Sequence, residues 1–199
     1  MSDETSEEGR ASDQDLSATL ARARTGDRDA LGALWVAHNH LVLRFLRGVG
    51  VRSADDVASN VWIDVAKGLP RFEGNPTDFR RWMFTIARRR AIDESRWFAR
   101  RPEDLAADTG DHLVSPDTAE CYEQQTAIDR ALAMIGALPT DQAEVILLRI
   151  ITDLDVGEVA AIVGKSEGNV RVIMHRGLQR LAERSVVTRV VGRTINSVP

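Results

Sequence analysis

The residues between Phe79 and Arg101 combine two kinds of side chain that act together on nucleic acids. Eight arginines in this segment are interleaved with five aromatic residues. Guanidinium groups follow a sugar-phosphate backbone, and aromatic rings stack on bases that have left the duplex. The segment therefore indicates a surface that captures unpaired bases and helps to hold melted DNA open. Helical spacing assigns three of its apolar residues to a hydrophobic core instead: Phe79, Trp82 and Ile86.

A second segment, from Asp155 to Leu181, has the spacing of a helix-turn-helix. The apolar residues of 156–163 give a short helix one buried face, and Gly164 stands where a sharp turn favours a positive φ. Ser166 is placed to cap a second helix. Apolar residues at helical intervals predict the buried stripe of that helix: Val170, Met174, Leu178 and Leu181.

The opposite face of the second predicted helix carries side chains that read base edges. Arginine can bond guanine through two hydrogen bonds, asparagine suits adenine, and an apolar group can touch the thymine methyl. In a helix-turn-helix the second helix enters the major groove. An ordinary helical hairpin with a charged surface remains an alternative from the pattern alone. The residues expected on this face are Asn169, Arg171, Val172, His175, Arg176 and Gln179, with Arg180 and Arg184 placed for phosphates.

The net charge of −4 conceals strong segregation along the chain. Residues 71–101 hold nine arginines against four carboxylates, and residues 165–193 hold seven basic residues against two acidic ones. Residues 1–15 and 102–125 are acidic, and the second of these segments has seven carboxylates and no lysine or arginine. Two basic blocks within an acidic protein indicate nucleic-acid partners.

Apolar residues recur at helical spacing throughout, which predicts an all-α fold. We expect two small helical domains joined by an acidic flexible linker at 102–121, with the helix-turn-helix in the C-terminal one. Asp27 and Ser53 are expected to cap two helices, and Thr77 or Asp78 a third. The predicted helices are 15–24, 30–46 (with Leu31, Leu34, Trp35, Leu41 and Phe45 as its apolar stripe), 53–68, 79–99, 122–138, 140–151, 156–163 and 166–181.

Several classes of function are disfavoured. No apolar run is long enough to span a membrane, and the acidic N-terminus lacks the chemistry of a secretion signal. The single cysteine, Cys121, favours a reducing cytoplasm and an inert thiol. The four histidines have no clear metal-binding spacing, and no nucleotide-binding glycine loop or nucleophile motif is present. We therefore expect no enzyme activity, no cofactor and no metal site.

Four ordered motifs resemble the extracytoplasmic-function sigma factors of bacterial RNA polymerase. Residues 79–93 resemble the segment that binds the −10 promoter element, and residues 54–62 resemble the preceding helix, which docks on a coiled coil of the largest polymerase subunit. Residues 137–149 are similar to the opening of the C-terminal domain, and 158–171 to its helix-turn-helix. The resemblance covers about 15–185 and implies promoter-specific transcription initiation with core RNA polymerase and promoter DNA as partners. An anti-sigma factor is implied as a further partner.

The resemblance also implies domain boundaries and sites. It assigns 1–14 to an acidic tail, 15–101 to a domain for polymerase binding and −10 melting, 102–121 to the linker, 122–185 to a −35-reading domain and 186–199 to a C-terminal extension. The linker can connect domains bound at separated promoter elements. The polymerase would be bound by Asp55, Asp56, Ser59, Asn60, Trp62 and Ile63. The −10 element would be bound by Phe72, Asn75, Arg80, Phe84, Arg88, Arg89, Arg90, Asp93, Arg96, Trp97 and Arg100, with Phe72, Arg89 and the loop to Asp78 around a flipped base. The −35 element would be bound by Lys165, Ser166, Glu167, Asn169, Arg171, Val172, His175, Arg176 and Arg180.

The sequence departs from the family pattern at three positions. The family often has asparagine in place of Arg89, an acidic residue in place of Asn60 and arginine in place of Ile173, so a base or phosphate contact is expected to be missing at Ile173. Two other functions compete with the resemblance: a stand-alone helix-turn-helix regulator, and a sigma-like module that only titrates partners. The segment 186–199 could lengthen the last helix, bind a partner or fray.

Overall fold

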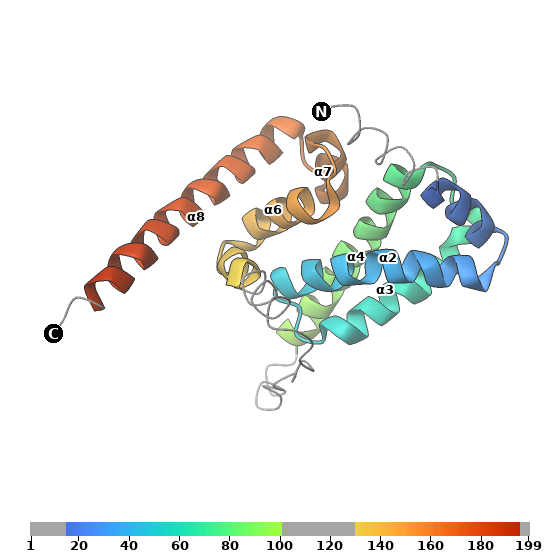
Figure 1. Cartoon of the computed structure of the whole chain (residues 1–199), viewed down its shortest axis with the longest axis horizontal. Helices are drawn as coiled ribbons and strands as arrows, with labels where there is room; N and C mark the ends of the chain where they lie inside the picture. The colour runs from blue at the N-terminus through green and yellow to red at the C-terminus, as the bar shows by residue number, and fades with distance from the viewer. Residues whose placement is uncertain (1–14, 101–129, 196–199) are drawn as a thin grey trace.

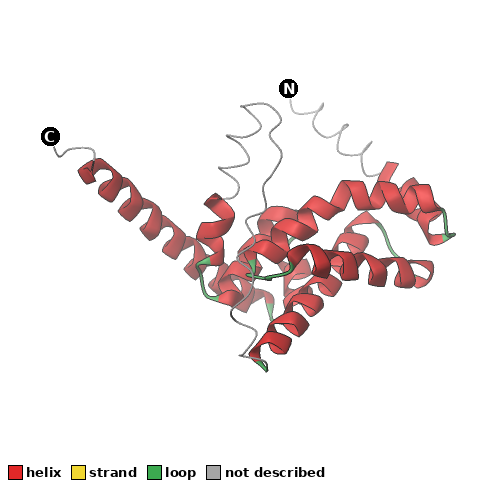
Figure 2. Ribbon diagram, turned by 90° about the horizontal axis from the view of Figure 1, so that it is seen from below, coloured by secondary structure: helices red, strands yellow, loops and turns green. Residues whose placement is uncertain are grey.

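The computed structural model describes residues 15–100 and 130–195, with side chains as far as Arg184. Every regular element in these two ranges is a helix, which confirms the predicted all-α class (Figure 1 and Figure 2). The acidic tail, the linker at 102–121, Cys121, the start of the helix expected from Tyr122 and the last four residues lie outside the described residues. None of the described helices is long and apolar enough to cross a membrane.

Residues 15–100 form the N-terminal unit. Residues 15–24 are helical, and α2 (Arg28–Gly48) follows after a turn at Gly26. As predicted, Asp27 caps α2, because its carboxylate accepts hydrogen bonds from the backbone N–H groups of Asp29 and Ala30. The hydrogen bond from Ala30, assisted by Arg22, lowers the pKa of that carboxyl group. The unit continues with α3 (Ala54–Gly68), one 3-10 turn, η1 (Leu69–Arg71), and α4 (Pro76–Ala99).

The start of α4 differs from the sequence prediction. Asn75, not Thr77 or Asp78, is the N-cap, and Pro76 is the first helical residue. The Asn75 side chain accepts from the Asp78 N–H at 2.9 Å, and the Asp78 carboxylate accepts from the Asn75 N–H at 3.1 Å. This reciprocal capping box satisfies two backbone donors and fixes the turn that leads into α4.

Residues 130–195 form the C-terminal unit. A helical segment at 130–136 leads into α6 (Thr140–Thr152), α7 (Val156–Val163) and α8 (Glu167–Ile195). Between α7 and α8, Gly164 adopts φ 68°, the left-handed conformation expected for the turn of the helix-turn-helix. The helix α8 continues to Ile195 and projects away from the other helices (Figure 1).

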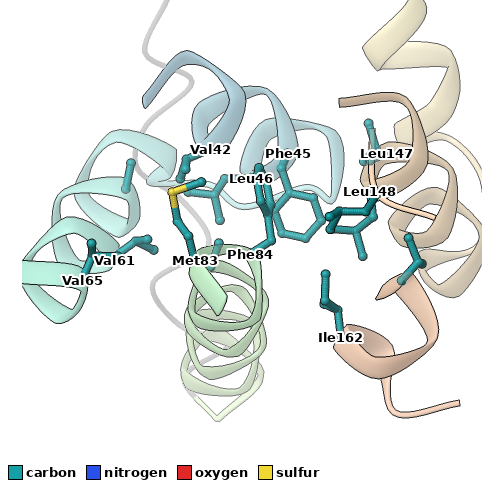
Figure 3. Packing of buried hydrophobic residues seen from close by; sticks show 14 of the residues in the cluster. Val42, Phe45, Leu46, Val61, Val65, Met83, Phe84, Leu147, Leu148 and Ile162 are labelled. Carbon is teal, nitrogen blue, oxygen red and sulfur yellow. The ribbon is translucent and has the colours of Figure 1, made fainter. Parts of the chain in front are cut away.

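One continuous hydrophobic core joins the two units. Phe45 of α2 and Phe84 of α4 are fully buried with their rings edge to face at 5.6 Å, and Leu148 of α6 and Ile162 of α7 lie against the same cluster (Figure 3). The sequence predicted a separate core for each unit, each near the lower size limit for independent stability. Merging them removes more apolar surface from water than either unit could bury alone.

The backbones of α2 and α6 approach closely at Gly48. A Cβ atom on Gly48 would lie 2.7 Å from Cδ1 of Leu147, whose side chain is fully buried. Glycine at position 48 therefore leaves room for the Leu147 side chain, whereas any larger residue would have to displace it. The second contact between the units is made by α4 and α7.

Two residues assigned to buried stripes lie on the surface instead. Trp35 of α2 is 48% exposed and Leu178 of α8 is also 48% exposed, so both predictions are wrong. Each lies at the edge of its helix's apolar stripe. Burial at such an edge depends on how neighbouring helices pack, which the spacing of apolar residues does not specify. The remaining stripe residues of α8 are buried or half-buried as predicted: Val170, Met174 and Leu181.

His38 is a buried titratable residue in the N-terminal unit. Its Nδ1 lies 2.9 Å from the Leu34 carbonyl oxygen, and its ring meets Phe79 edge to face at 5.5 Å. Burial lowers the pKa of His38, and the nearby positive charge of Arg80 lowers it further. The folded protein therefore holds this imidazole neutral at a pH where the unfolded chain already binds a proton.

This linkage predicts an acid-sensitive fold. As the pH falls through the usual histidine value of 6.5, the unfolded state gains a proton that folded His38 does not accept, so the free energy of unfolding decreases. His38→Gln should flatten that decline in urea titrations followed by circular dichroism at pH 7.5, 6.5 and 5.5. His175→Gln, at an exposed position on α8, is the matched control. An identical pH dependence in wild type and His38→Gln would contradict the prediction.

Candidate nucleic-acid and polymerase interfaces

The first turns of α8 present a continuous polar face to solvent. The start of the helix is held by Ser166, whose hydroxyl oxygen accepts from the Asn169 N–H at 3.3 Å. One turn on, Arg171 and Glu167 form an exposed ion pair at 2.8 Å, which is weak enough to exchange for another partner. All nine residues predicted to read the −35 element are exposed: Lys165, Ser166, Glu167, Asn169, Arg171, Val172, His175, Arg176 and Arg180.

The middle of α8 is anchored to its own unit. Gly177 lies against α6 so closely that a Cβ atom there would be 2.6 Å from Cδ1 of Ile146. Arg180 donates to the Gln142 side-chain oxygen at 2.8 Å, and Arg184 donates to the Ala137 carbonyl at 3.0 Å. These contacts fix the direction in which the first turns of α8 point.

The C-terminal half of α4 carries the exposed part of the arginine and aromatic segment. Trp97 is 45% exposed and packs edge to face on Phe98. A shallow groove of about 430 Å³ runs between α3 and α4, with Lys67 and Arg89 contributing positive charge to its lining. Six of the eleven residues predicted for the −10 site are exposed: Asn75, Arg89, Asp93, Arg96, Trp97 and Arg100.

Two aromatic residues predicted for that site are buried. Phe84 is fully buried in the shared core, so this structure does not place it on a DNA-binding surface. Phe72 is 8% exposed and stacks on Trp82 with ring centroids 5.1 Å apart. One face of its ring is therefore already occupied by Trp82 in this structure. The core positions predicted for Phe79, Trp82 and Ile86 are confirmed.

Three of the arginines predicted for the −10 site are half-buried and already have partners. Arg90 pairs with Asp64 of α3, its Nε donating at 2.7 Å, and Arg88 pairs with Glu144 of α6, also at 2.7 Å. Arg80 donates to the Thr77 hydroxyl at 3.2 Å, while its Nε is buried without a partner. Sequence spacing could not show these pairs, because two of the three partners come from other helices.

One face of α3 is polar and exposed along its length. Of the residues predicted to bind polymerase, Asp55, Asp56, Ser59, Asn60 and Ile63 are exposed. Trp62 is not: it is 8% exposed, and its indole N–H donates to the Asn39 side-chain oxygen at 3.0 Å. Trp62 therefore packs α3 onto α2 and does not lie on the exposed face of α3.

The start of α3 is held by Glu94, which the sequence did not single out. Ser53 is the N-cap as predicted, but its side chain makes no capping hydrogen bond. Instead, the carboxylate of Glu94 on α4 accepts from the backbone N–H groups of Arg52, at 3.3 Å, and Ser53, at 3.0 Å. The Arg52 guanidinium also lies 4.9 Å from the ring centre of Phe98. No local signal could reveal this cap, because its carboxylate is 41 residues away in the chain.

Ile173 explains one departure from the family pattern. It is 6% exposed and belongs to the core on the inner face of α8, beside Val170. A side chain in this position cannot reach DNA. The base or phosphate contact expected to be missing at residue 173 is therefore prevented by the burial of the position and not by the change of residue type. The exposed neighbour is Val172, at 46%.

Two family descriptions match this chain on either side of its central segment. Sigma-70 region 2 matches residues 34–101, which end with α4, and Sigma-70 region 4 matches residues 128–181, which include α6 and α7. The ECF RNA polymerase sigma factor SigD of Mycobacterium tuberculosis is 34% identical over 182 residues, covering 86% of this chain and 84% of that protein. The chain belongs to the extracytoplasmic-function sigma factors.

Further comparisons agree with the sigma-factor assignment. The ECF sigma factor ShbA of Streptomyces griseus is 32% identical, covering 83% of this chain and 93% of that protein. A structure of CnrH in complex with the cytosolic domain of CnrY has a TM-score of 0.62, at 22% identity and with 86% of this chain and 97% of that chain covered. The sigma factor RpoE of Bartonella quintana, in complex with the anti-sigma factor NepR, has a TM-score of 0.60 at 20% identity, with 76% and 94% covered. These two structures share the fold of this sigma factor.

The match to region 2 disfavours the stand-alone regulator. A stand-alone helix-turn-helix regulator leaves the N-terminal unit without a role, whereas a promoter-directing sigma factor uses both matched regions. Sigma factors as a family are not enzymes. In the described ranges, no group of three or more histidine, cysteine, aspartate or glutamate residues could hold a metal ion.

The burial of Ile173 gives a testable prediction for this sigma factor. Ile173→Arg should lower the free energy of unfolding by about 3 to 5 kcal/mol, because it places an unpaired charge in the core. Val172→Arg, one residue away but exposed, should change it by no more than about 0.5 kcal/mol. Urea denaturation of both variants measures the difference. Equal stability of the two variants would place residue 173 outside the core.

Proposed function

We propose that this sigma factor divides promoter recognition between α8, which reads the −35 duplex, and α4, which captures the melted −10 strand, while α3 binds core RNA polymerase. In this proposal, residues 15–101 form the polymerase and −10 domain and residues 122–185 form the −35 domain. The observation that supports this proposal is the difference in chemistry between the exposed faces of α8 and α4. The α8 face offers hydrogen-bonding groups, whereas the α4 face combines arginines with an exposed tryptophan.

The α8 face has the composition needed for duplex reading. Arg171 and Arg176 can each bond a guanine through two hydrogen bonds, and Asn169 can do the same with an adenine. Val172 offers an apolar contact for a thymine methyl group, and its exposed fraction of 46% leaves it available. Because Gly177 and Arg180 hold the helix on α6, these side chains can enter a major groove as a rigid set.

The α4 face suits unpaired DNA. Trp97 provides a stacking surface, and such stacking is worth about 1 to 3 kcal/mol per base. Arg89, Arg96 and Arg100 surround it with positive charge that can follow the backbone of a single strand. Duplex DNA offers no free base faces, so this chemistry favours the melted state over the closed one.

The exposed face of α3 suits a polymerase contact. Asp55 and Asp56 lie in its first turn, where carboxylates are stabilised by the helix dipole, and Asp55 also pairs with Arg47 at 3.4 Å. Glu94 fixes this first turn from α4, and Trp62 fixes the middle of the helix from beneath. The acidic face is therefore presented on a rigid support, which limits the ordering cost of binding.

Regulation and location follow from the same proposal. The RpoE structure with which this fold is shared contains an anti-sigma factor, and we extend the expectation of such a partner to this chain. We infer a cytoplasmic location, because promoter DNA and RNA polymerase are found there. The proposal includes no catalytic activity and no cofactor.

Transcription in vitro tests the proposed function directly. Purified core RNA polymerase and this chain should together produce promoter-specific transcripts from genomic fragments, and core polymerase alone should not. Arg176→Ala should weaken promoter binding by about 1 to 3 kcal/mol and relax preference at one −35 base pair. The control is Arg28→Ala, at an exposed position at the start of α2. An absence of promoter-specific transcripts with the wild-type chain would refute the proposal.

Two exposed tryptophans provide a matched test of strand capture. Trp97→Ala should reduce promoter opening about tenfold, measured by the fluorescence of 2-aminopurine in the −10 strand, because a base-stacking surface is lost. Trp35→Ala removes a ring of similar exposure on α2, 48% against 45%, and should leave opening unchanged. Equal effects of the two substitutions would rule out a specific role for Trp97.

A further inference from the structure

Glu167 is the one carboxylate on the face of α8 assigned to duplex reading. The nine residues predicted for the −35 element include three arginines and one lysine, and Glu167 is their single acidic member. It is the first residue of α8, at the end of the helix that contacts base edges in a helix-turn-helix. A negative charge there is repelled by the phosphates that line the groove, so it lowers the affinity for DNA of any sequence. A residue of this kind can instead serve the choice between sequences.

The partner of Glu167 is Arg171, one turn further along α8. The Arg171 Nη2 donates to Oε2 of Glu167 at 2.8 Å. Side chains on a helix lean toward its N-terminus, so an arginine at position i+4 reaches back over a glutamate at position i. The pair therefore draws the guanidinium group toward the end of α8 that meets the bases. Arg176 has no such neighbour, because the residue four positions before it is Val172.

Glu167 is itself held from the neighbouring helix. A Cβ atom on Gly157 would lie 3.2 Å from Oε1 of Glu167 and 3.3 Å from Oδ1 of Asp155, so both carboxylates approach the first turn of α7 where a glycine leaves room. Asp155 is the N-cap of α7, and the positive end of that helix dipole stabilises negative charge beside it. The Glu167 carboxylate thus lies between the start of α7 and Arg171, with one oxygen directed toward each.

The pair contributes direction rather than stability. Both side chains are more than half exposed, at 60% for Arg171 and 53% for Glu167, and exposed ion pairs contribute little to folding. A guanidinium group has five N–H donors, and Glu167 accepts from Nη2 alone. Enough donors remain for Arg171 to bond N7 and O6 of one guanine while it keeps its contact with Glu167.

The competing partner of Arg171 on DNA is the phosphate backbone. Phosphates accept the same donors as guanine does, but they are identical in every sequence. Water is displaced from the groove on binding, so the contact with Glu167 is stronger there than in the free protein. Moving the guanidinium to a phosphate would break this contact and leave a carboxylate facing the DNA backbone. Glu167 therefore favours guanine over phosphate as the partner of Arg171.

We propose that Glu167 is a positioning residue that directs Arg171 to a guanine of the −35 element and away from the phosphate backbone. Its charge lowers the affinity of α8 for DNA in general and raises the preference for one base pair. This inference rests on the proposed function of α8, because it requires the first turns of the helix to lie in the major groove.

Selection of promoter sequences tests this role in the holoenzyme. Core RNA polymerase carrying the full-length chain binds promoter duplexes randomised in the −35 region, and the bound duplexes are sequenced. Wild type should select a guanine that Arg171→Ala no longer selects. Glu167→Gln should reduce the preference for that same guanine about tenfold and leave the preference read by Arg176 unchanged. A wild-type chain without any base preference removes both the proposed function of α8 and this inference, whereas a preference that survives Glu167→Gln removes the inference alone.

Salt dependence separates positioning from a loss of structure. On a duplex of unrelated sequence, Glu167→Gln should bind more tightly than wild type, and its plot of log K against log salt should be steeper by about 0.9, as expected for one additional phosphate contact. Weaker binding to every duplex with no steeper slope would show a structural role and contradict the proposal. The control is Glu183→Gln, which removes an exposed charge about four turns further along α8. An equally steeper slope for this control would assign the effect to net charge and overturn the proposal.

Discussion

The meeting of Phe45, Phe84 and Leu148 is the contact on which the described structure depends. It lies where α2, α4 and α6 converge, and it is the place where two units with separate sequence signatures share one core. Each unit alone is near the lower size for a self-sufficient core. The arrangement of the charged helices is consequently set by a small apolar junction.

The helix α4 illustrates the competing demands on such a structure. Its inner face supplies Phe79, Met83 and Phe84 to the core. The opposite face of the same helix carries the arginines. Two of its arginines pair with carboxylates on other helices, Arg90 with Asp64 and Arg88 with Glu144. Pairing reduces the repulsion between neighbouring positive charges and also holds the helix in place. The cost is that a paired arginine must exchange partners before it binds DNA.

Sequence patterns predicted local structure well and contacts between helices poorly. The fold class, the caps at Asp27 and Ser166, the left-handed turn at Gly164 and the exposed face of α8 all depend on residues within a few positions of each other. Burial of Phe84 and Trp62 depends on packing against other helices, so residue type and spacing alone did not reveal it. Glu94, Glu144 and Gly48 were missed for the same reason, since each acts through a partner more than 40 residues distant.

The Glu94 carboxylate has a mechanical consequence. It connects the last third of α4 to the first backbone N–H groups ahead of α3, and the Phe98 ring holds Arg52 beside it. A small rotation of α4 on binding a DNA strand would pull on the same turn that carries Asp55 and Asp56. Thermodynamic linkage then requires reciprocity: any tightening of the polymerase contact by DNA equals the tightening of the DNA contact by polymerase. A single side chain thereby ties the end of α4 to the start of α3, the two helices proposed to bind DNA and polymerase.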